Sequence, residues 1–137
     1  MWTCPFCQQK FVHANQQHSC NERTVNDFLA GKSGRTVSLF YTFIAEYKKM
    51  GDFVLHPART RIAFASRIRF GYIHRLGKDF VDVVLTFDRP HRDNLCFYRI
   101  GEVPGGKIFQ HYLRIFRPED LNEEVRKYMK MALFAGS

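Results

Sequence analysis

Four residues near the start of the chain have the types and spacing of a zinc site. Cys4 and Cys7 form a C-x2-C pair, and His18 and Cys20 follow after ten intervening residues. Zinc in proteins takes four thiolate or imidazole ligands in a tetrahedron, and a C-x2-C turn points two sulfurs at one ion. The spacing predicts a Cys3His zinc site, with His13 as the alternative nitrogen ligand to His18. Four protein ligands would leave no open position, so we expect the zinc to be structural.

The use of cysteine in this chain favours a metal site over disulfide bonds. Cys4, Cys7 and Cys20 are clustered, whereas Cys96 is alone far away and is expected to be a small core residue in a strand. The chain starts without a basic region followed by an apolar stretch, so we expect no secretory signal and a reducing, cytoplasmic location. Free or disulfide-linked cysteines are the alternative. A bound zinc ion can contribute on the order of 10 kcal/mol to ordering such a short segment.

Three segments of the chain have the patterns of helices. Thr24 followed by Asp27 is a capping-box pattern, which predicts the start of a short helix. Apolar residues at steps of three and four predict an amphipathic helix from about Thr36 to Met50. Pro118 followed by two acidic residues predicts the start of a C-terminal helix.

Alternating apolar and polar residues predict the strands of an antiparallel sheet. We expect strands over residues 53–55, 62–64, 68–72, 80–87, 95–100 and 108–116. Leu76 to Lys78 is expected to be a turn, and Asp82, which alternates outward in its strand, is expected to be exposed.

The order of these elements predicts an α+β fold in two parts. Residues 1–22 would form a zinc-finger-like segment, and residues 23–137 an α+β domain. That domain would contain two helices, an antiparallel sheet of five to six strands and a C-terminal helix packed on one sheet face. The longest apolar runs are only a few residues, so we expect no membrane-spanning helix.

Positive charge is concentrated in one stretch of the chain. The formal net charge is +8, and residues 32–75 carry nine lysines and arginines against only Glu46 and Asp52. Strand parity places several of these arginines on one sheet face, with the small residues Ala63 and Gly71 between them. The candidate ligand-binding residues are Arg59, Arg61, Arg69, Tyr72, Tyr112 and Arg114, and Arg99 is expected to join them.

A face of this composition predicts a binding module for nucleic acid or another phosphorylated ligand. Guanidinium groups bind phosphates in a bidentate manner, and tyrosine rings stack on bases. The alternative is a solvated outer sheet face whose charge only keeps the protein soluble. His56 and His74 lie near the basic region and could add to an anion site, although we expect them to be ordinary surface residues.

Two further functions are compatible with the sequence. One is an enzyme of unknown class with a pocket near His111, which shares its inward parity with Leu113. A single histidine on an apolar face is more often a hydrogen-bonded core residue, so we favour a non-enzymatic function. The other is a protein-interaction scaffold. Gly31-Lys32-Ser33 resembles the end of a phosphate-binding loop, but Asn26 stands where the full pattern needs glycine.

The sequence also resembles a known family over nearly the whole chain. The residues that carry the resemblance are Trp2-Thr-Cys4-Pro-Phe-Cys7, Asn15-Gln-Gln-His18-Ser-Cys20, Thr24-Val-Asn-Asp27-Phe-Leu-Ala-Gly-Lys32, Thr60-Arg61-Ile62-Ala-Phe64, His111-Tyr-Leu-Arg114 and Pro118-Glu-Asp-Leu121. These blocks resemble an uncharacterised bacterial family, domain of unknown function 5655. The resemblance implies a compact α+β domain after a zinc-finger-like opening, and it implies no established activity.

The chain departs from that family pattern at Arg117. The family tends to have a hydroxyl residue before the Pro-Glu-Asp-Leu helix, so arginine there weakens the expected helix cap. The order of elements is also similar to that of the YdhG-like, iron-chaperone-like group, at the level of layout alone, which carries no function.

Overall fold

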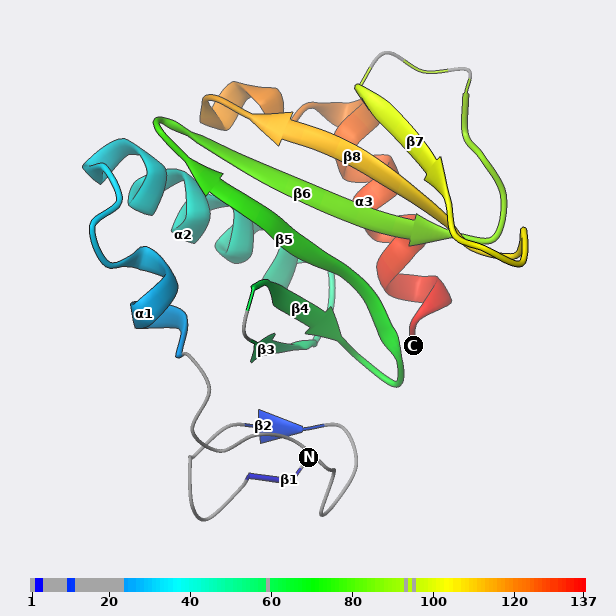
Figure 1. The fold of residues 1–137 in the computed structure, drawn as a ribbon, viewed down its shortest axis with the longest axis horizontal. Coiled ribbons are helices and arrows are strands. Elements are labelled where there is room, and N and C mark those ends of the chain that lie inside the picture. The colour runs from blue at the N-terminus through cyan, green and yellow to red at the C-terminus, as the bar shows by residue number, and fades with distance from the viewer. Residues whose placement is uncertain (1, 4–9, 12–23, 59, 93, 95) are drawn as a thin grey trace.

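The structure, a computed structural model, describes residues 2–3, 10–11, 24–58, 60–92, 94 and 96–137. Within these ranges the predicted α+β class is confirmed, with a six-stranded antiparallel sheet and three α-helices. A two-stranded antiparallel sheet pairs β1 (Trp2–Thr3) with β2 (Lys10–Phe11) ahead of the main domain, as Figure 1 shows. The predicted zinc ligands lie outside the described residues, namely Cys4, Cys7, His18 and Cys20, with the alternative His13.

The main sheet is a meander with one strand inserted out of order. Its strand order is β3-β4-β5-β6-β8-β7, and all neighbours are antiparallel. The chain therefore leaves the sheet after β6, forms β7 at the far edge, and returns as β8 between them (Figure 1). The strands are β3 (Val54–Pro57), β4 (Ile62–Ala65), β5 (Arg69–Gly77), β6 (Phe80–Phe87), β7 (Arg99–Glu102) and β8 (Phe109–Ile115).

Two strands differ most from their predicted bounds. β5 continues through Leu76 to Gly77, where the sequence predicts a turn, because Gly77 still pairs with Phe80 of β6. The hairpin loop is thereby shortened to two residues, and Asp79 in that loop has a positive φ of 62°, as tight hairpin loops require. At the other edge, β7 begins at Arg99 rather than at residue 95, so Cys96 precedes the strand.

Side-chain caps fix the starts of the first two helices. α1 (Val25–Leu29) begins with the predicted capping box, in which the backbone and side chain of Thr24 and Asp27 exchange hydrogen bonds of 2.8 and 3.2 Å. α2 (Gly34–Lys48) begins after Ser33, whose hydroxyl accepts a hydrogen bond from a backbone N–H of the first turn. Both caps satisfy backbone donors that a helix start leaves without partners.

The C-terminal helix begins later than predicted. Pro118–Asp120 forms a short 3-10 turn instead of the first helical turn. The helix itself is α3 (Glu123–Ala135), and its cap is Asn122, whose side-chain oxygen accepts from the N–H of Val125 at 3.0 Å. Asparagine is a strong helix cap, so the helix does not need a hydroxyl residue at position 117.

The helices cover one face of the sheet and enclose an aromatic core, with α2 and α3 on the same side (Figure 1). Five rings from α2, β4, β5 and the residue before β3 pack with centroid separations of 5.1 to 6.0 Å. They belong to Phe43, Tyr47, Phe53, Phe64 and Phe70. The buried Tyr47 hydroxyl donates a 2.6 Å hydrogen bond to the carbonyl of Met129, which ties α2 to α3.

A bulge in β5 makes the predicted position of Gly71 wrong. The sequence analysis places Gly71 on the arginine face beside Ala63. In the structure Ala63 pairs with Tyr72, because Phe70 is an extra residue where the register of β4 and β5 shifts. One extra residue reverses which face the following side chains occupy. Gly71 instead faces the core, where an added Cβ would lie 2.6 Å from the carbonyl oxygen of Val84.

Candidate binding face of the sheet

The sheet face opposite the helices carries two tyrosines in a small buried cluster. Ala63, Tyr72, Val84 and Tyr112 stand opposite one another across β4, β5, β6 and β8. They form a cluster separate from the main core, and each tyrosine is only 8% exposed. The structure thus brings together the two tyrosines that the sequence analysis places with the arginines.

Two arginines lie over these tyrosine rings. The guanidinium carbon of Arg61 is 4.3 Å from the ring centroid of Tyr72, and that of Arg99 is 5.0 Å from the ring centroid of Tyr112. Both arginines are exposed. Guanidinium groups are attracted to aromatic faces and can stack on them. A ligand that approaches this face therefore meets the guanidinium groups before it meets the tyrosine rings.

Arg114 belongs to the same face, but its charge is compensated by Asp82. The Arg114 Nε and Nη2 atoms donate to the two carboxylate oxygens at 2.6 and 2.9 Å, in a bidentate pair. Asp82 also accepts a 3.2 Å hydrogen bond from the Tyr98 hydroxyl. The expectation that Asp82 is exposed is wrong: it does point away from the core, but it is only 2% exposed because these neighbours cover it. The hydrogen bonds from Arg114 to Asp82 raise the pKa of that guanidinium.

Three exposed residues of this face are missing from the predicted site. Tyr98 is 52% exposed, and burial followed by the charge of Asp82 raises its pKa, so the phenol stays protonated. His74 is exposed, with its ring 5.4 Å from that of Tyr112. Arg75 is exposed and stands opposite Asp82, because a register shift in β5 follows Ile73. Strand parity could not place His74 and Arg75, since the shift is not encoded in the alternation of residues.

The remaining predicted residues lie elsewhere or outside the described chain. Arg69 pairs with Ala65 at the start of β5, toward the opposite end of that strand from Arg75. Arg59 lies outside the described residues. His56, expected at the surface, is 4% exposed and pairs with Ala63 across β3 and β4.

His111 is a core residue with both ring nitrogens engaged. It is fully buried among the rings of Phe87 and Phe97, at centroid distances of 4.7 and 4.9 Å. The backbone N–H of His91 donates to Nε2 at 3.0 Å, and Nδ1 lies 3.1 Å from the carbonyl oxygen of Phe109. These contacts assign the proton to Nδ1, and burial lowers the pKa of the imidazole. This arrangement favours the structural interpretation of His111 over the catalytic one.

Comparisons of the chain with protein families, with curated proteins and with solved structures found no match. The described residues contain no group of three or more His, Cys, Asp or Glu side chains that could hold a metal ion. Among the described helices, none has both the length and the apolar character that crossing a membrane requires. The resemblance to domain of unknown function 5655 and the zinc site therefore stay predictions.

Proposed function

We propose that this protein is a nucleic-acid-binding module whose ligand lies across the open face of the sheet. The observation that carries the proposal is a group of three exposed arginines and one exposed histidine on one face, which we call the basic face: Arg61, His74, Arg75 and Arg99. Among the described residues, no carboxylate lies within ion-pair distance of these side chains. The charge of the three arginines is therefore available to phosphate groups.

The composition of the basic face favours a single strand over a duplex. Arg61 and Arg99 place their guanidinium groups over tyrosine rings, and guanidinium groups and aromatic rings can stack on unpaired bases. Tyr98 adds an exposed ring at the same face. Proteins read single strands by stacking bases on such planes while cations follow the backbone. A phosphate-only ligand would use the charge but not the rings.

Asp82 and Arg114 have a supporting part in this proposal. Because their bidentate pair is internally compensated, Arg114 adds little net charge to the face. Arg114 lies 4.4 Å from the Phe80 ring and 5.0 Å from the Tyr98 ring, measured from the guanidinium carbon to the centroid. It therefore orients Tyr98, and we class it as a positioning residue rather than a ligand contact.

The N-terminal segment would contribute a structural zinc ion. The C-x2-C pair of Cys4 and Cys7 and the later His18 and Cys20 support this part of the proposal. The paired strands β1 and β2 flank the first two of these cysteines in sequence. Such a segment can act as a second contact for a nucleic-acid backbone or only as a small folded extension.

The test is fluorescence anisotropy with labelled single strands of deoxythymidine and of uridine, about twelve nucleotides long, beside a duplex of the same length. The decisive variant is Arg61→Ala/Arg99→Ala, which removes two charges and two stacking planes from the basic face. We expect its affinity for the single strands to fall about tenfold or more. Wild-type protein should bind the single strands more tightly than the duplex.

The matched control is Lys127→Ala/Lys130→Ala, which removes two charges from α3. This helix packs on the other face of the sheet, and both lysines are exposed. The control should bind within about twofold of wild type if location rather than net charge matters. If the two double variants lose the same affinity, binding depends only on the net charge of the protein and not on the basic face. That result would overturn the proposal.

A further inference from the structure

The end of β5 extends past its neighbour β4 and leaves an open sheet edge. Pairing with β4 reaches Ile73, which stands opposite Ile62, whereas β5 continues to Gly77. The chain before β4 turns away there, in a bend in which the Ala58 N–H donates to the Arg61 carbonyl at 2.8 Å. The Gly77 carbonyl is occupied by the hydroxyl of Thr36 at 2.7 Å. The open stretch is therefore His74–Leu76, beside which the described residues place no strand on the β4 side.

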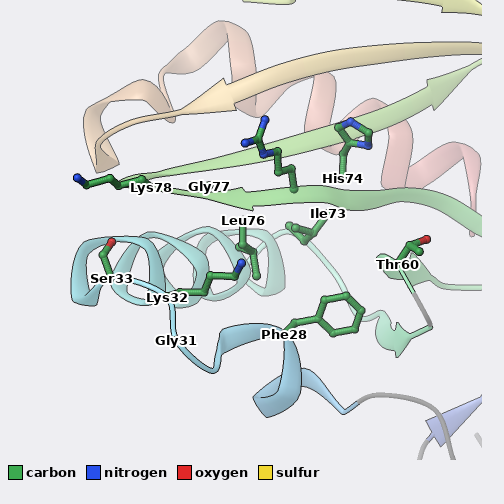
Figure 2. Close-up of a pocket in the computed structure, with 11 residues that line it drawn as sticks. Phe28, Gly31, Lys32, Ser33, Thr60, Ile73, His74, Leu76, Gly77 and Lys78 are labelled. Carbon is green, nitrogen blue, oxygen red and sulfur yellow. The ribbon is translucent and has the colours of Figure 1, made fainter.

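This edge forms one wall of a cavity of about 700 Å³. The loop between α1 and α2, from Gly31 to Ser33, lies across from β5, and Thr60 lies at one end of the cavity (Figure 2). Figure 2 shows Leu76 pointing from β5 toward the helices and Lys32 extending from the loop toward β5. An open backbone edge thus faces a space large enough for an extended chain.

The lining of the cavity is apolar on one side and cationic at its rim. Phe28, Ile73 and Leu76 supply the apolar part, and Lys32, Arg75 and Lys78 are exposed cations. The described lining includes no carboxylate. The nearest acidic residue in sequence, Asp79, is held by the Ser33 hydroxyl at 2.7 Å and so is already engaged. The cavity therefore selects for a ligand with negative charge next to apolar groups.

We propose that this edge binds an acidic, extended segment of a partner protein by strand addition. A strand offers alternating N–H and C=O groups, which is what an open sheet edge needs from its neighbour. The added strand would run beside His74–Leu76 in place of a longer β4. Its inward side chains would lie against Phe28 and Leu76, and its carboxylates would reach Lys32 and Lys78. A nucleic-acid backbone has phosphate acceptors but no matching row of donors, so it fits this edge poorly.

The first experiment uses the isotope-labelled full chain and three capped octapeptides followed by NMR. The probe alternates valine and glutamate; one control alternates valine and lysine, and the other keeps the glutamates but has a central proline. We expect saturable binding of the valine–glutamate peptide in the submillimolar range and slower amide hydrogen exchange within His74–Leu76. Both controls should bind about tenfold more weakly or worse, because proline removes a backbone donor and lysine reverses the charge.

The cavity shares His74 and Arg75 with the basic face, so variants at residues that only one of the two sites contains are needed to distinguish them. Lys32→Glu/Lys78→Glu should weaken the valine–glutamate peptide by about tenfold, whereas Lys107→Glu, an exposed lysine absent from this lining, should change its affinity less than twofold. Arg61→Ala/Arg99→Ala should retain peptide binding and slowed exchange at His74–Leu76. This proposal therefore stands or falls independently of nucleic-acid binding.

Three results would overturn the inference. The first is the absence of binding at millimolar peptide. The second is binding of the proline peptide as tightly as the valine–glutamate peptide, or binding without slowed exchange at His74–Leu76, because either shows charge attraction without strand addition. The third is competition by inorganic phosphate at comparable concentration with shifts confined to Lys32 and its neighbours, which would make the cavity a small-anion site.

Discussion

Asp82 holds the Arg114 guanidinium and the Tyr98 hydroxyl together on the open face of the sheet. It is 2% exposed, so water compensates its charge poorly when a partner is removed. Its outward direction follows from strand parity, but its burial depends on Arg114, which is far away in sequence and adjacent only through the β6–β8 register. Alternation in sequence predicts the face of a residue, not the long side chain that covers it.

Replacing Asp82 with asparagine should lower the stability of the protein but raise its affinity for a single strand. Asp82→Asn loses charge-assisted hydrogen bonds to Arg114, and we expect the free energy of unfolding in urea to fall by about 1–3 kcal/mol. The same change leaves Arg114 uncompensated on the basic face, so the affinity for a single strand should rise. The matched control is Asp88→Asn, which is exposed and should leave stability within about 0.5 kcal/mol of wild type. If the two variants change the free energy of unfolding equally, the buried pair of Asp82 and Arg114 is contradicted.

His111 makes the stability of the protein dependent on pH. Burial lowers its pKa in the folded state below the ordinary value of about 6.5. The unfolded chain therefore binds the proton more readily, so the stabilisation is fully present above about pH 6.5 and declines as the pH falls toward the folded-state pKa. We expect wild type to lose more stability than His111→Gln between pH 7 and pH 5, in parallel denaturation series. Glutamine keeps a donor and an acceptor but does not titrate. If stability falls equally with pH in wild type and His111→Gln, His111 is not the source of the pH dependence.

At the scale of elements, the ends and irregularities of strands are the part that sequence patterns miss. The capping box of Thr24 and Asp27 and the bounds of β6 are predicted correctly, because both depend on local spacing. The extra residue at Phe70 and the shift after Ile73 are missed, because each depends on how a neighbouring strand pairs. These two irregularities place Tyr72, His74 and Arg75 on the basic face.

The bulge of β5 predicts opposite effects for two glycine substitutions. In Gly71→Ala the new Cβ would lie 2.6 Å from the Val84 carbonyl oxygen, which is backbone and cannot move without disturbing β6. We expect a loss of about 1–3 kcal/mol in the free energy of unfolding. Gly34→Ala, at the start of α2 with no atom within 4 Å of the new Cβ, should be neutral or stabilising by up to about 1 kcal/mol. Thermal or urea unfolding measures both, and equal stability of the two variants would contradict the bulge.

The N-terminal element predicts a metal content that can be measured directly. Reduced protein should carry about one equivalent of zinc by elemental analysis, and Cys7→Ser should lose most of it. The α+β domain has its own core over residues 28–133, so removal of zinc by a chelator should leave its unfolding transition nearly unchanged. The comparison variant is Cys96→Ser, at a cysteine remote in sequence whose pKa burial raises to about 12, and it should keep the zinc. Substoichiometric zinc in carefully reduced wild type would contradict the site.

For the whole molecule, composition indicates the class of partner but not its place. A net charge of +8 concentrated in residues 32–75 predicts an anionic partner. Within that stretch, however, Arg61 lies on the basic face, Lys32 lies at the cavity beside β5, and Arg75 borders both. The fold therefore distributes one basic segment over two surfaces. Counting charges along the sequence does not predict this distribution.

Salt dependence tests how many of these charges a bound single strand engages. When the logarithm of the binding constant is plotted against the logarithm of the salt concentration, each contacted phosphate contributes about −0.7 to the slope. Three contacts, one for each arginine of the basic face, give a slope of roughly −2. Arg61→Ala/Arg99→Ala should reduce its magnitude by roughly 1.4, while Lys127→Ala/Lys130→Ala should keep it. A slope near zero in wild type would exclude phosphate contacts as the source of affinity.

The insertion of β8 between β6 and β7 has a consequence for the order in which the molecule assembles. The strands β3 to β6 join successive hairpins, so each can form by closing a short loop at low entropic cost. The pairing of Phe87 with Phe109 is different, because it must enclose the chain segment 88–108. This closure carries most of the sheet's long-range contact order, and such closures slow folding. We therefore expect the arrival of β8 to limit the folding rate, with the β3–β6 meander forming first.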